Sequence, residues 1–293
     1  MTSATVVIPV LNGGATIGDT LRALLNQVNS PADFEIIVVD NGSTDNTLEV
    51  VRGFPVTLHQ AATPGVSAAR NVGLKAGKGE IFVCLDADTL PSRTWLRELL
   101  HPFADHGVIL AGGRTLSFRP ETGSEKYIER AGLFRPENSI HNPDFPFVVG
   151  CNLAVRREAA LAIGGWDESL LRAEDIEFST RLSDRFPSPI HYAQNALLFH
   201  RNRRSDKELA DQARGYGQGL ALIYRRYPGR VQWNLSKRLL ILGRLINRSL
   251  QPELLRLGHW LGSVSDEQLE FTRYHRLWTL SFWRGFFSTW YTN

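Results

Sequence analysis

Two hydrophobic patterns alternate over the first third of the chain. Continuous apolar runs rich in valine and isoleucine, at 5–10, 34–40 and 80–86, predict strands that are covered on both faces. A further strand is predicted at 56–60, and a helix from Val66. Between the first two runs, apolar residues recur at helical spacing: Ile17, Leu21, Leu24, Leu25 and Val28. This order predicts an α/β fold with a parallel sheet and right-handed crossovers.

The pattern changes after residue 108. Apolar runs at 108–118 and 145–157 predict further strands, separated by a longer polar insertion. A Gly-Gly turn and a loop precede a helix that is predicted to begin at Glu174 or Asp175, and another strand-like run ends at His200. The second half of the sheet is therefore predicted to be built from more widely spaced strands.

These patterns predict two parts. Residues 1–204 form a mostly parallel central sheet flanked by helices, with 1–105 and 106–204 as its two halves. Residues 205–293 read as a helical extension. Sheets of this type bind ligands outside the carboxyl ends of their strands, so the functional site is expected at that edge.

Charge is distributed unevenly along the chain. The net formal charge is +3, but residues 1–196 carry a balance of −6 and residues 197–293 a balance of +9. A basic C-terminal third predicts a phosphate-rich partner, either a nucleotide or an anionic membrane surface, and no nucleic acid partner is expected.

The cysteines and the hydropathy limit the cellular compartments in which the protein is expected. Cys84 and Cys151 are the only cysteines and form no CxxC pair, which predicts a reducing compartment without disulfides or a zinc site. The N-terminus lacks the pattern of a secretory leader. Arg244 and Arg248 interrupt the most apolar C-terminal segment, so no membrane span is expected. We expect a cytoplasmic protein, at the membrane face if the basic third binds lipid.

Two carboxylates follow the strand at 80–86. If the strand continues, Asp86 and Asp88 project to the same side of it. Paired carboxylates at a ligand-binding edge suit Mg²⁺ or Mn²⁺, with substrate phosphates completing the coordination. The alternative is that Asp88 caps a helix beginning near Pro91, because Asp and an early proline are both common at helix starts.

A third carboxylate ends the strand at 34–40. Asp40 stands at the strand end, before the turn-forming sequence "NGSTDNT". From this edge a carboxylate can accept a hydrogen bond from the imide N–H of a uracil, which favours a uridine nucleotide. The alternative is an ordinary polar turn.

Five segments together resemble the family 2 glycosyltransferases, which have the GT-A fold. They are "VVIPVLN", "VVDNGSTDNT", "GVSAARNVGLKAGKGEIFVCLDAD", "VGCNLAVRREAALAIGGWDE" and "AEDIEFSTRL". Their order and spacing over roughly residues 4–200 make the resemblance specific. It implies that residues 1–204 are the catalytic domain, with a nucleotide-binding half followed by an acceptor-binding half.

The resemblance implies a set of donor-binding residues. Pro9, Val10, Leu11 and Asp40 would hold the nucleoside, with Arg70 near the base or diphosphate. Asp86 would face the ribose and the metal, and Asp88 would ligate Mn²⁺ or Mg²⁺. Some relatives use a histidine near His200 as a further metal ligand, and that role is left open here because most lone histidines have none.

The resemblance also implies the acceptor side. Asp175 would be the general base, and Glu174 and Trp166 would hold the acceptor. The incoming hydroxyl loses a proton as it attacks, which requires a carboxylate within hydrogen-bond reach. One base opposite the leaving group implies direct displacement with inversion. The alternative is that Glu174 and Asp175 only stabilise a helix N-terminus.

Departures from the family pattern narrow the function. Leu11 stands where the family often has an aromatic residue, which leaves the base less certain: a UDP-sugar is favoured, with GDP- and dTDP-sugars as alternatives. The segment "QARGY" (212–216) replaces the Gln-x-x-Arg-Trp signature of processive synthases. Transfer of one sugar to a glycan, lipid-linked or small-molecule acceptor, such as a cell-envelope precursor, is therefore predicted. The rival functions are a non-catalytic nucleotide- or glycan-binding subunit and a sugar nucleotidyltransferase.

The C-terminal tail is aromatic. Residues 260–293 hold 10 of the 29 aromatic residues, and five of them share one face of a predicted helix: Phe271, Tyr274, Trp278, Phe282 and Phe286. This stripe has two interpretations. It binds a membrane interface as a peripheral contact, or it packs against the catalytic domain or a second subunit of a homo-oligomer.

Overall fold

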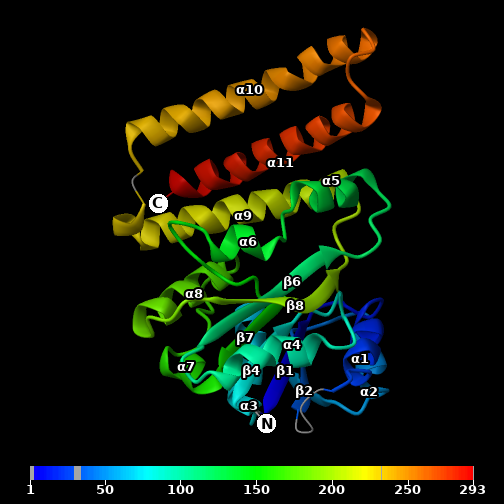
Figure 1. Cartoon of the computed structure of the whole chain (residues 1–293), viewed down its shortest axis with the longest axis vertical. Helices are drawn as coiled ribbons and strands as arrows, with labels where there is room; N and C mark the ends of the chain where they lie inside the picture. The colour runs from blue at the N-terminus through cyan, green and yellow to red at the C-terminus, as the bar shows by residue number, and fades with distance from the viewer. Residues whose placement is uncertain (1–2, 30–33, 232, 293) are drawn as a thin grey trace. The chain divides into compact units, whose positions relative to one another are not determined.

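A computed structural model describes residues 3–29, 34–231 and 233–292. An eight-stranded sheet has the order β3-β2-β1-β4-β7-β6-β8-β5 (Figure 1). The strands are β1 Ala4–Val10, β2 Phe34–Asp40, β3 Thr57–Gln60, β4 Ile81–Leu85, β5 Thr89–Pro91, β6 Leu110–Ser117, β7 Asn152–Arg156 and β8 His191–His200. The first four spatial neighbours run parallel, β7 is antiparallel to β4 and β6, and β5 is antiparallel to β8. The α/β fold with a helix-flanked central sheet is confirmed, and the sheet is mixed beyond β4.

Helices cover the sheet because each sheet face is apolar. They are α1 Ile17–Leu25, α2 Thr47–Arg52, α3 Val66–Ala76, α4 Trp95–Leu100, the short 3₁₀ turn His101–Ala104, α6 Pro136–Ile140, α7 Arg157–Ala162 and α8 Glu174–Arg185. Alternate residues of β1 point to opposite faces. Val6 and Ile8 join a core with Leu21 of α1 and Leu96 of α4, whereas Val7 joins a second core on the other face.

Three element ends differ from those that the sequence patterns suggested, and one of them is the helix start near Pro91 that was given as an alternative. The strand predicted at 80–86 stops at Leu85, and Pro91 closes the short strand β5 instead of opening a helix. The next helix, α4, begins at Trp95. The strand predicted at 145–157 begins only at Asn152. The turn at 86–88 ends the first run, and the segment 145–151, which contains Pro146 and Gly150, does not form a strand; the apolar pattern alone revealed neither.

The chain forms two compact units. The first comprises 1–118 and 134–201, and the second comprises 119–133 and 202–293. The second unit contains the helices α5 Gly123–Ala131, α9 Asp206–Arg226, α10 Leu235–Trp260 and α11 Asp266–Trp290, with a 3₁₀ turn at Pro228–Arg230. The predicted boundary at 204 was a single cut, whereas the segment 119–133 groups with the C-terminal helices.

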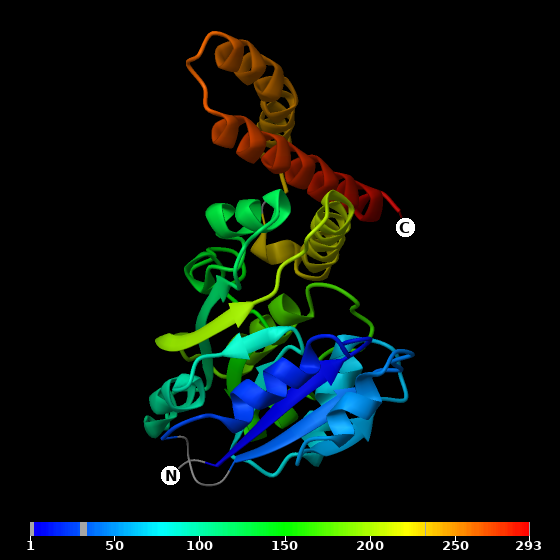
Figure 2. The same ribbon diagram turned by 90° about the vertical axis from the view of Figure 1, so that its right-hand side faces the viewer.

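The second unit is helical, as the patterns from residue 205 onward predicted. Figure 2 shows α10 and α11 as a helical hairpin, and α11 also lies along α9. Two glycines allow α9 and α11 to approach closely: a Cβ on Gly217 would meet the Phe282 carbonyl oxygen at 1.9 Å, and one on Gly285 the Arg214 carbonyl oxygen at 2.1 Å. Among the described residues, no helix is both long and apolar enough to cross a membrane.

The aromatic stripe of α11 packs inside the second unit. Tyr127 of α5 contacts the rings of Phe271, Tyr274 and Trp278. Phe286 is fully buried against Tyr224 of α9 and Trp233. The stripe therefore packs against partners within its own unit, which neither of the two interpretations from the sequence had named.

Candidate active site

Three predicted metal ligands come together at the end of β4. Strand β5 pairs with β8 so that Thr89 lies opposite His200, which sets Asp88 beside the imidazole. The ligand atoms of Asp86, Asp88 and His200 all lie within 4.8 Å of one another, and His200 Nε2 is 3.6 Å from an Asp88 carboxylate oxygen. Because β4 has already ended, the two aspartates converge through a turn and not through strand alternation.

This turn is held from several sides. The Thr20 hydroxyl lies within hydrogen-bond reach of the Ala87 and Thr89 carbonyl oxygens, and the Thr89 hydroxyl donates to the Asp86 carbonyl oxygen. The backbone N–H of Arg201 donates to the Asp88 carbonyl oxygen. These contacts fix the backbone of both aspartates while leaving their carboxylates to face a ligand.

The three side chains fit a hard divalent cation. Two metal–oxygen bonds of about 2.1 Å reach across about 4.2 Å, which is comparable to the separation of these ligand atoms. Carboxylate oxygens are donors that both Mn²⁺ and Mg²⁺ prefer, and the imidazole is a softer donor that suits Mn²⁺ better than Mg²⁺. The second ring nitrogen of His200, Nδ1, is buried and finds no hydrogen-bond partner in the described part of the chain. Stacking on Phe134, with ring centroids 4.9 Å apart, orients the imidazole instead.

The acidic pair sits at the N-terminus of α8. Ala173, with a φ of 59°, is in the left-handed region that L-residues disfavour, and it turns the chain so that the helix opens with Glu174 and Asp175. The free N–H groups of this helix end favour negative charge there. Asp175 Oδ2 accepts a hydrogen bond of 2.7 Å from the Gly150 N–H.

Arg70 of α3 connects the acidic pair with Asp86, one of the candidate metal ligands. Its guanidinium Nη1 lies 2.7 Å from Asp175 Oδ1 and 3.2 Å from Glu174 Oε1, and Nη2 lies 3.8 Å from Asp86 Oδ1. Burial alone would lower the pKa of Arg70, but the charges of Asp175 and Glu174 outweigh it and raise the pKa. Arg70 was expected near the base or diphosphate, and the structure places this permanent cation among the carboxylates.

Gly150 explains how this cluster is packed. A Cβ at this position would lie 2.2 Å from Arg70 Nη2 and 2.6 Å from Asp175 Oδ1. The glycine therefore leaves room for the arginine–aspartate pair and also donates its N–H to Asp175. Gly150 lies within the motif "VGCN", but its role was not predicted from the sequence.

Burial changes the protonation of the acids. It raises the pKa of Asp86, against the opposing charge of Arg70. Burial and the adjacent charge of Asp175 raise the pKa of Glu174 from 4.5 to about 7, although Arg70 acts in the opposite direction. The pKa of Glu174 therefore lies near neutral pH.

We expect Glu174 to make stability depend on pH. Between pH 4.5 and about 7 the folded chain keeps the Glu174 proton and the unfolded chain has lost it. The free energy of unfolding therefore falls as pH rises through this window, and that contribution is fully present only below it. Melting temperatures of the wild type and Glu174→Gln, measured with EDTA from pH 5 to 8, should diverge, with the wild type losing ground as pH rises. A difference that stays constant with pH would contradict the assignment.

The predicted nucleoside loop is tied together by polar contacts. Asn12, Gly13 and Gly14, after β1, donate backbone N–H bonds to the side chains of Ser43, Thr47 and Asp45, respectively. Pro9 and Val10 lie in β1, and Leu11, which follows them, is 59% exposed. An exposed apolar side chain at this edge offers a surface on which a base can lie.

Asp40 has a different environment from the one expected. It is only 1% exposed, and its carboxylate accepts hydrogen bonds from the N–H groups of Gly42 and Ser43. In this conformation Asp40 shapes the loop, which matches the polar-turn alternative. The hydrogen bond from a uracil N–H to Asp40 stays a prediction.

Trp166 lies in the core and not on an acceptor surface. It is 2% exposed and stacks on Phe178, with ring centroids 3.9 Å apart. The Arg70 guanidinium lies 5.8 Å from its ring centroid. The Trp166 ring therefore packs beside the Arg70 guanidinium, and its burial argues against the acceptor contact predicted for it.

Asn71 is a structural residue that the sequence analysis missed. Its side chain bonds both the N–H and the carbonyl oxygen of Trp166, and it also donates to Glu168. It thereby anchors the loop that leads to the acidic pair onto α3. Its position directly after Arg70 in "AARN" was the available signal.

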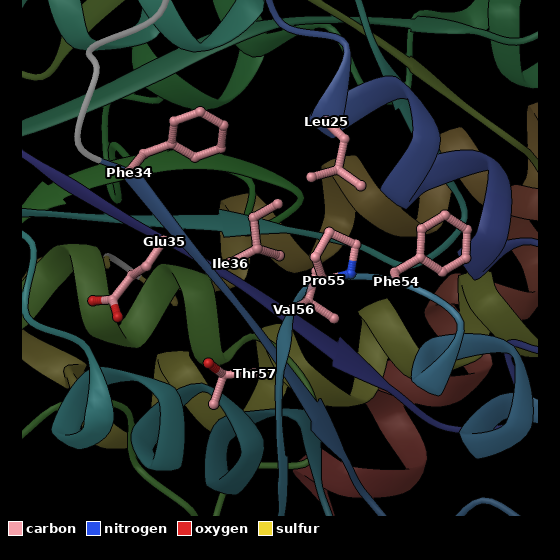
Figure 3. A pocket seen from close by; sticks show the side chains of 8 residues that line it. All are labelled: Leu25, Phe34, Glu35, Ile36, Phe54, Pro55, Val56 and Thr57. Carbon is pink, nitrogen blue, oxygen red and sulfur yellow. The ribbon is translucent and has the colours of Figure 1, made fainter.

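A hollow of about 450 Å³ lies away from this cluster (Figure 3). It is lined by Leu25, Phe34, Glu35, Ile36, Phe54, Pro55, Val56 and Thr57. Apart from Leu25, which ends α1, these residues lie at or just before the amino ends of β2 and β3, whereas the acidic cluster includes the residues that follow the carboxyl end of β4. Its one carboxylate, Glu35, already accepts from Thr5 and from the Lys78 N–H. The hollow therefore offers no chemistry comparable to that of the cluster.

Comparison with known proteins identifies relatives of the chain. The sequence profile described as "Glycosyl transferase family 2" matches residues 5–164, more than half of the chain. Glycosyltransferase AglE of Haloferax volcanii is 29% identical over 241 residues, which cover 79% of this chain and 74% of AglE.

Solved structures agree at the level of the fold. The mannosyltransferase PcManGT from Pyrobaculum calidifontis, solved in complex with GDP-Man and Mn²⁺, matches 99% of this chain and 87% of its own with a TM-score of 0.70 and 19% identity. Glucosyl-3-phosphoglycerate synthase from Mycobacterium tuberculosis, solved with Mn²⁺, UDP and glucosyl-3-phosphoglycerate, matches 77% and 80% with a TM-score of 0.56 and 24% identity. Together they support the GT-A type of sheet.

Proposed function

We propose a reaction for this chain, which belongs to glycosyl transferase family 2 and is a glycosyltransferase. It moves a single sugar from a nucleoside-diphosphate sugar to a hydroxyl group of an acceptor, with inversion at the sugar carbon. The reaction depends on a divalent cation, with Mn²⁺ or Mg²⁺ held by Asp86, Asp88 and His200.

One observation carries this proposal. Arg70 bridges the two carboxylate groups that the reaction needs, since one of its nitrogens pairs with Asp175 and the other lies 3.8 Å from Asp86. A metal-binding carboxylate and a candidate base are thus held by one buried guanidinium. This arrangement sets the leaving group and the attacking hydroxyl in a defined relation to each other.

The residues then take the following roles. When bound, the cation offsets the negative charge that develops on the departing diphosphate. Asp175 accepts the proton of the acceptor hydroxyl as its oxygen bonds to the sugar carbon and the bond from that carbon to the diphosphate oxygen breaks. Both Asp175 oxygens already accept one hydrogen bond, but each keeps a further lone pair for the hydroxyl. Glu174, beside it, holds the acceptor.

We propose UDP as the nucleotide part of the donor. The support is the UDP bound to glucosyl-3-phosphoglycerate synthase, whereas the exposed Leu11 offers a surface for any base. Because PcManGT was solved with GDP-Man, a guanine nucleotide is the alternative to test against it. The acceptor class is a glycan or a lipid-linked sugar.

Calorimetric titration tests this proposal directly. UDP, GDP and dTDP are titrated into the protein with Mn²⁺ and again with EDTA. We expect UDP to bind, and we expect EDTA to abolish that binding because the diphosphate is held through the cation. Asp105→Asn, a change of one carboxylate outside the cluster, serves as the control and should bind as the wild type does.

Each other outcome has a definite meaning. Selective binding of GDP would replace UDP as the donor nucleotide and leave the chemistry unchanged. If the nucleotide binds equally well with and without EDTA, the proposed dependence on a divalent cation is wrong. No binding of any of the three would overturn the proposal.

A further inference from the structure

Helix α10 exposes a row of apolar side chains. Five of them recur three or four residues apart, which places them along one side of the helix. Their exposed fractions are 70% for Leu235, 57% for Leu239, 53% for Leu242, 52% for Ile246 and 58% for Leu250. Trp260, at the helix end, is 80% exposed. We call this row the α10 apolar face.

The α10 apolar face is not the side of the helix that contacts α11. Ile241 is 4% exposed, and it lies near the opposite side of the helix from Ile246 because five residues correspond to about 500° of rotation. Helix α10 contacts α11 within the same unit, and Ile241 marks the buried side of α10. The apolar face is a second surface on the same helix.

The charges on α10 are almost all positive. The helix carries five basic residues, Lys237, Arg238, Arg244, Arg248 and Arg256, and one acidic residue, Glu253. Glu253 pairs with Arg256 at 2.8 Å. Arg238 and Arg256 are 18 residues apart, about five helical turns, so both lie on the same flank of the apolar face.

The geometry points to an anionic membrane surface as the occupant of the α10 apolar face. A helix with exposed leucines, a terminal tryptophan and arginines on its flank lies in the headgroup region with its apolar side toward the acyl chains. The arginines complement the negative charge of anionic lipid headgroups. This inference does not depend on the proposed reaction.

A second copy of the chain is a poorer occupant. Two α10 faces packed against each other would bring their arginines together, with only Glu253 of each helix as an opposing charge. Like charges brought together in this way oppose association. The charge pattern therefore favours lipid over a homodimer through this helix.

This inference relocates the membrane contact that the sequence suggested. The stripe predicted on residues 260–293 has Tyr127, Tyr224 and Trp233 as partners, whereas the α10 apolar face has exposed leucines. Removing α11 would therefore unfold the second unit and would not report on lipid binding. Substitutions on α10 are the appropriate test.

Vesicle co-sedimentation of the full chain tests the inference. Vesicles of phosphatidylcholine alone are compared with vesicles that contain about 30% phosphatidylglycerol. We expect the wild type to bind only the anionic vesicles, and binding to weaken as salt rises. Leu239→Ser combined with Ile246→Ser should abolish binding, whereas Leu161→Ser, an exposed leucine of α7, should leave it unchanged.

A second variant keeps the apolar face and removes charge. Arg238→Gln combined with Arg256→Gln should weaken binding roughly 25-fold, since each arginine near an anionic surface contributes about five-fold. Thermal melts confirm that each variant is folded. The inference is overturned if the wild type does not bind anionic vesicles, or if either double variant binds as well as the wild type. It is also overturned if the chain self-associates without lipid and the serine variant abolishes only that association.

Discussion

Replacing Asp88 by asparagine will remove metal-supported sugar transfer. Asp88 and His200 face each other across the β5–β8 pair, and an amide oxygen is a much weaker ligand for a hard cation than a carboxylate. Because a cation at the leaving group is worth several kcal/mol, kcat/KM should fall by at least about a thousandfold. The measurement is initial-rate transfer over a series of Mn²⁺ concentrations.

Two controls separate the metal role from a loss of folding. Asp105→Asn should retain wild-type turnover, and the melting temperature of Asp88→Asn in EDTA should match that of the wild type in EDTA.

His200→Ala should raise the Mn²⁺ concentration needed for half-maximal activity, with excess Mn²⁺ restoring turnover. If Asp88→Asn transfers sugar at the wild-type rate, or if the wild type works unchanged in EDTA, the metal site is misassigned.

Asp175→Asn will lower turnover and leave donor binding nearly unchanged. The asparagine keeps the size of the side chain and can still accept the Gly150 N–H bond, but it cannot take a proton. General-base catalysis contributes about 10²- to 10⁴-fold, so kcat should fall by that order. The measurements are single-turnover rates at saturating donor and acceptor, together with the donor Kd from calorimetry.

Glu174→Gln provides the matched comparison. It alters the adjacent carboxyl group of the same helix turn, which also contacts Arg70. If Asp175 is the base and Glu174 holds the acceptor, Glu174→Gln should mainly raise the KM for the acceptor. A large loss of donor affinity in Asp175→Asn would show that this residue serves the nucleotide. A larger fall of kcat in Glu174→Gln than in Asp175→Asn would assign the base to Glu174, whose pKa of about 7 suits proton transfer.

Several elements of the first unit could be predicted from local patterns. Apolar runs and helical spacing located β1, β2, α1 and α3, because short-range periodicity reflects which face of an element is buried. The spacing of Asp86 and Asp88 predicted that they group together, but the structure brings them together through a turn and not through the strand alternation on which that prediction rested. His200 was a candidate through the family resemblance, and the pairing of β5 with β8 supplied the physical reason for its place.

The environment of each acidic or basic side chain was harder to predict. Asp40, expected to face a base, turns back onto its own loop, and Trp166 lies under Arg70 in the core. Arg70 pairs with a carboxylate 105 positions later in the sequence. Such contacts depend on how α3 and α8 pack on the sheet, and no local period records that packing.

The sequence by itself determined the family and the order of strands and helices in the first half, and it supplied the candidate residues for the chemistry. Only the tertiary structure decided that one arginine links both groups of carboxylates, and which amphipathic helix of the second unit exposes its apolar side. Helices α10 and α11 both have apolar stripes. The stripe of α11 packs against α5 and α9, which approaches closely at Gly217 and Gly285, whereas the leucines of α10 stay exposed. Amphipathicity shows that a helix has an apolar side, whereas the packing partner determines whether that side is buried.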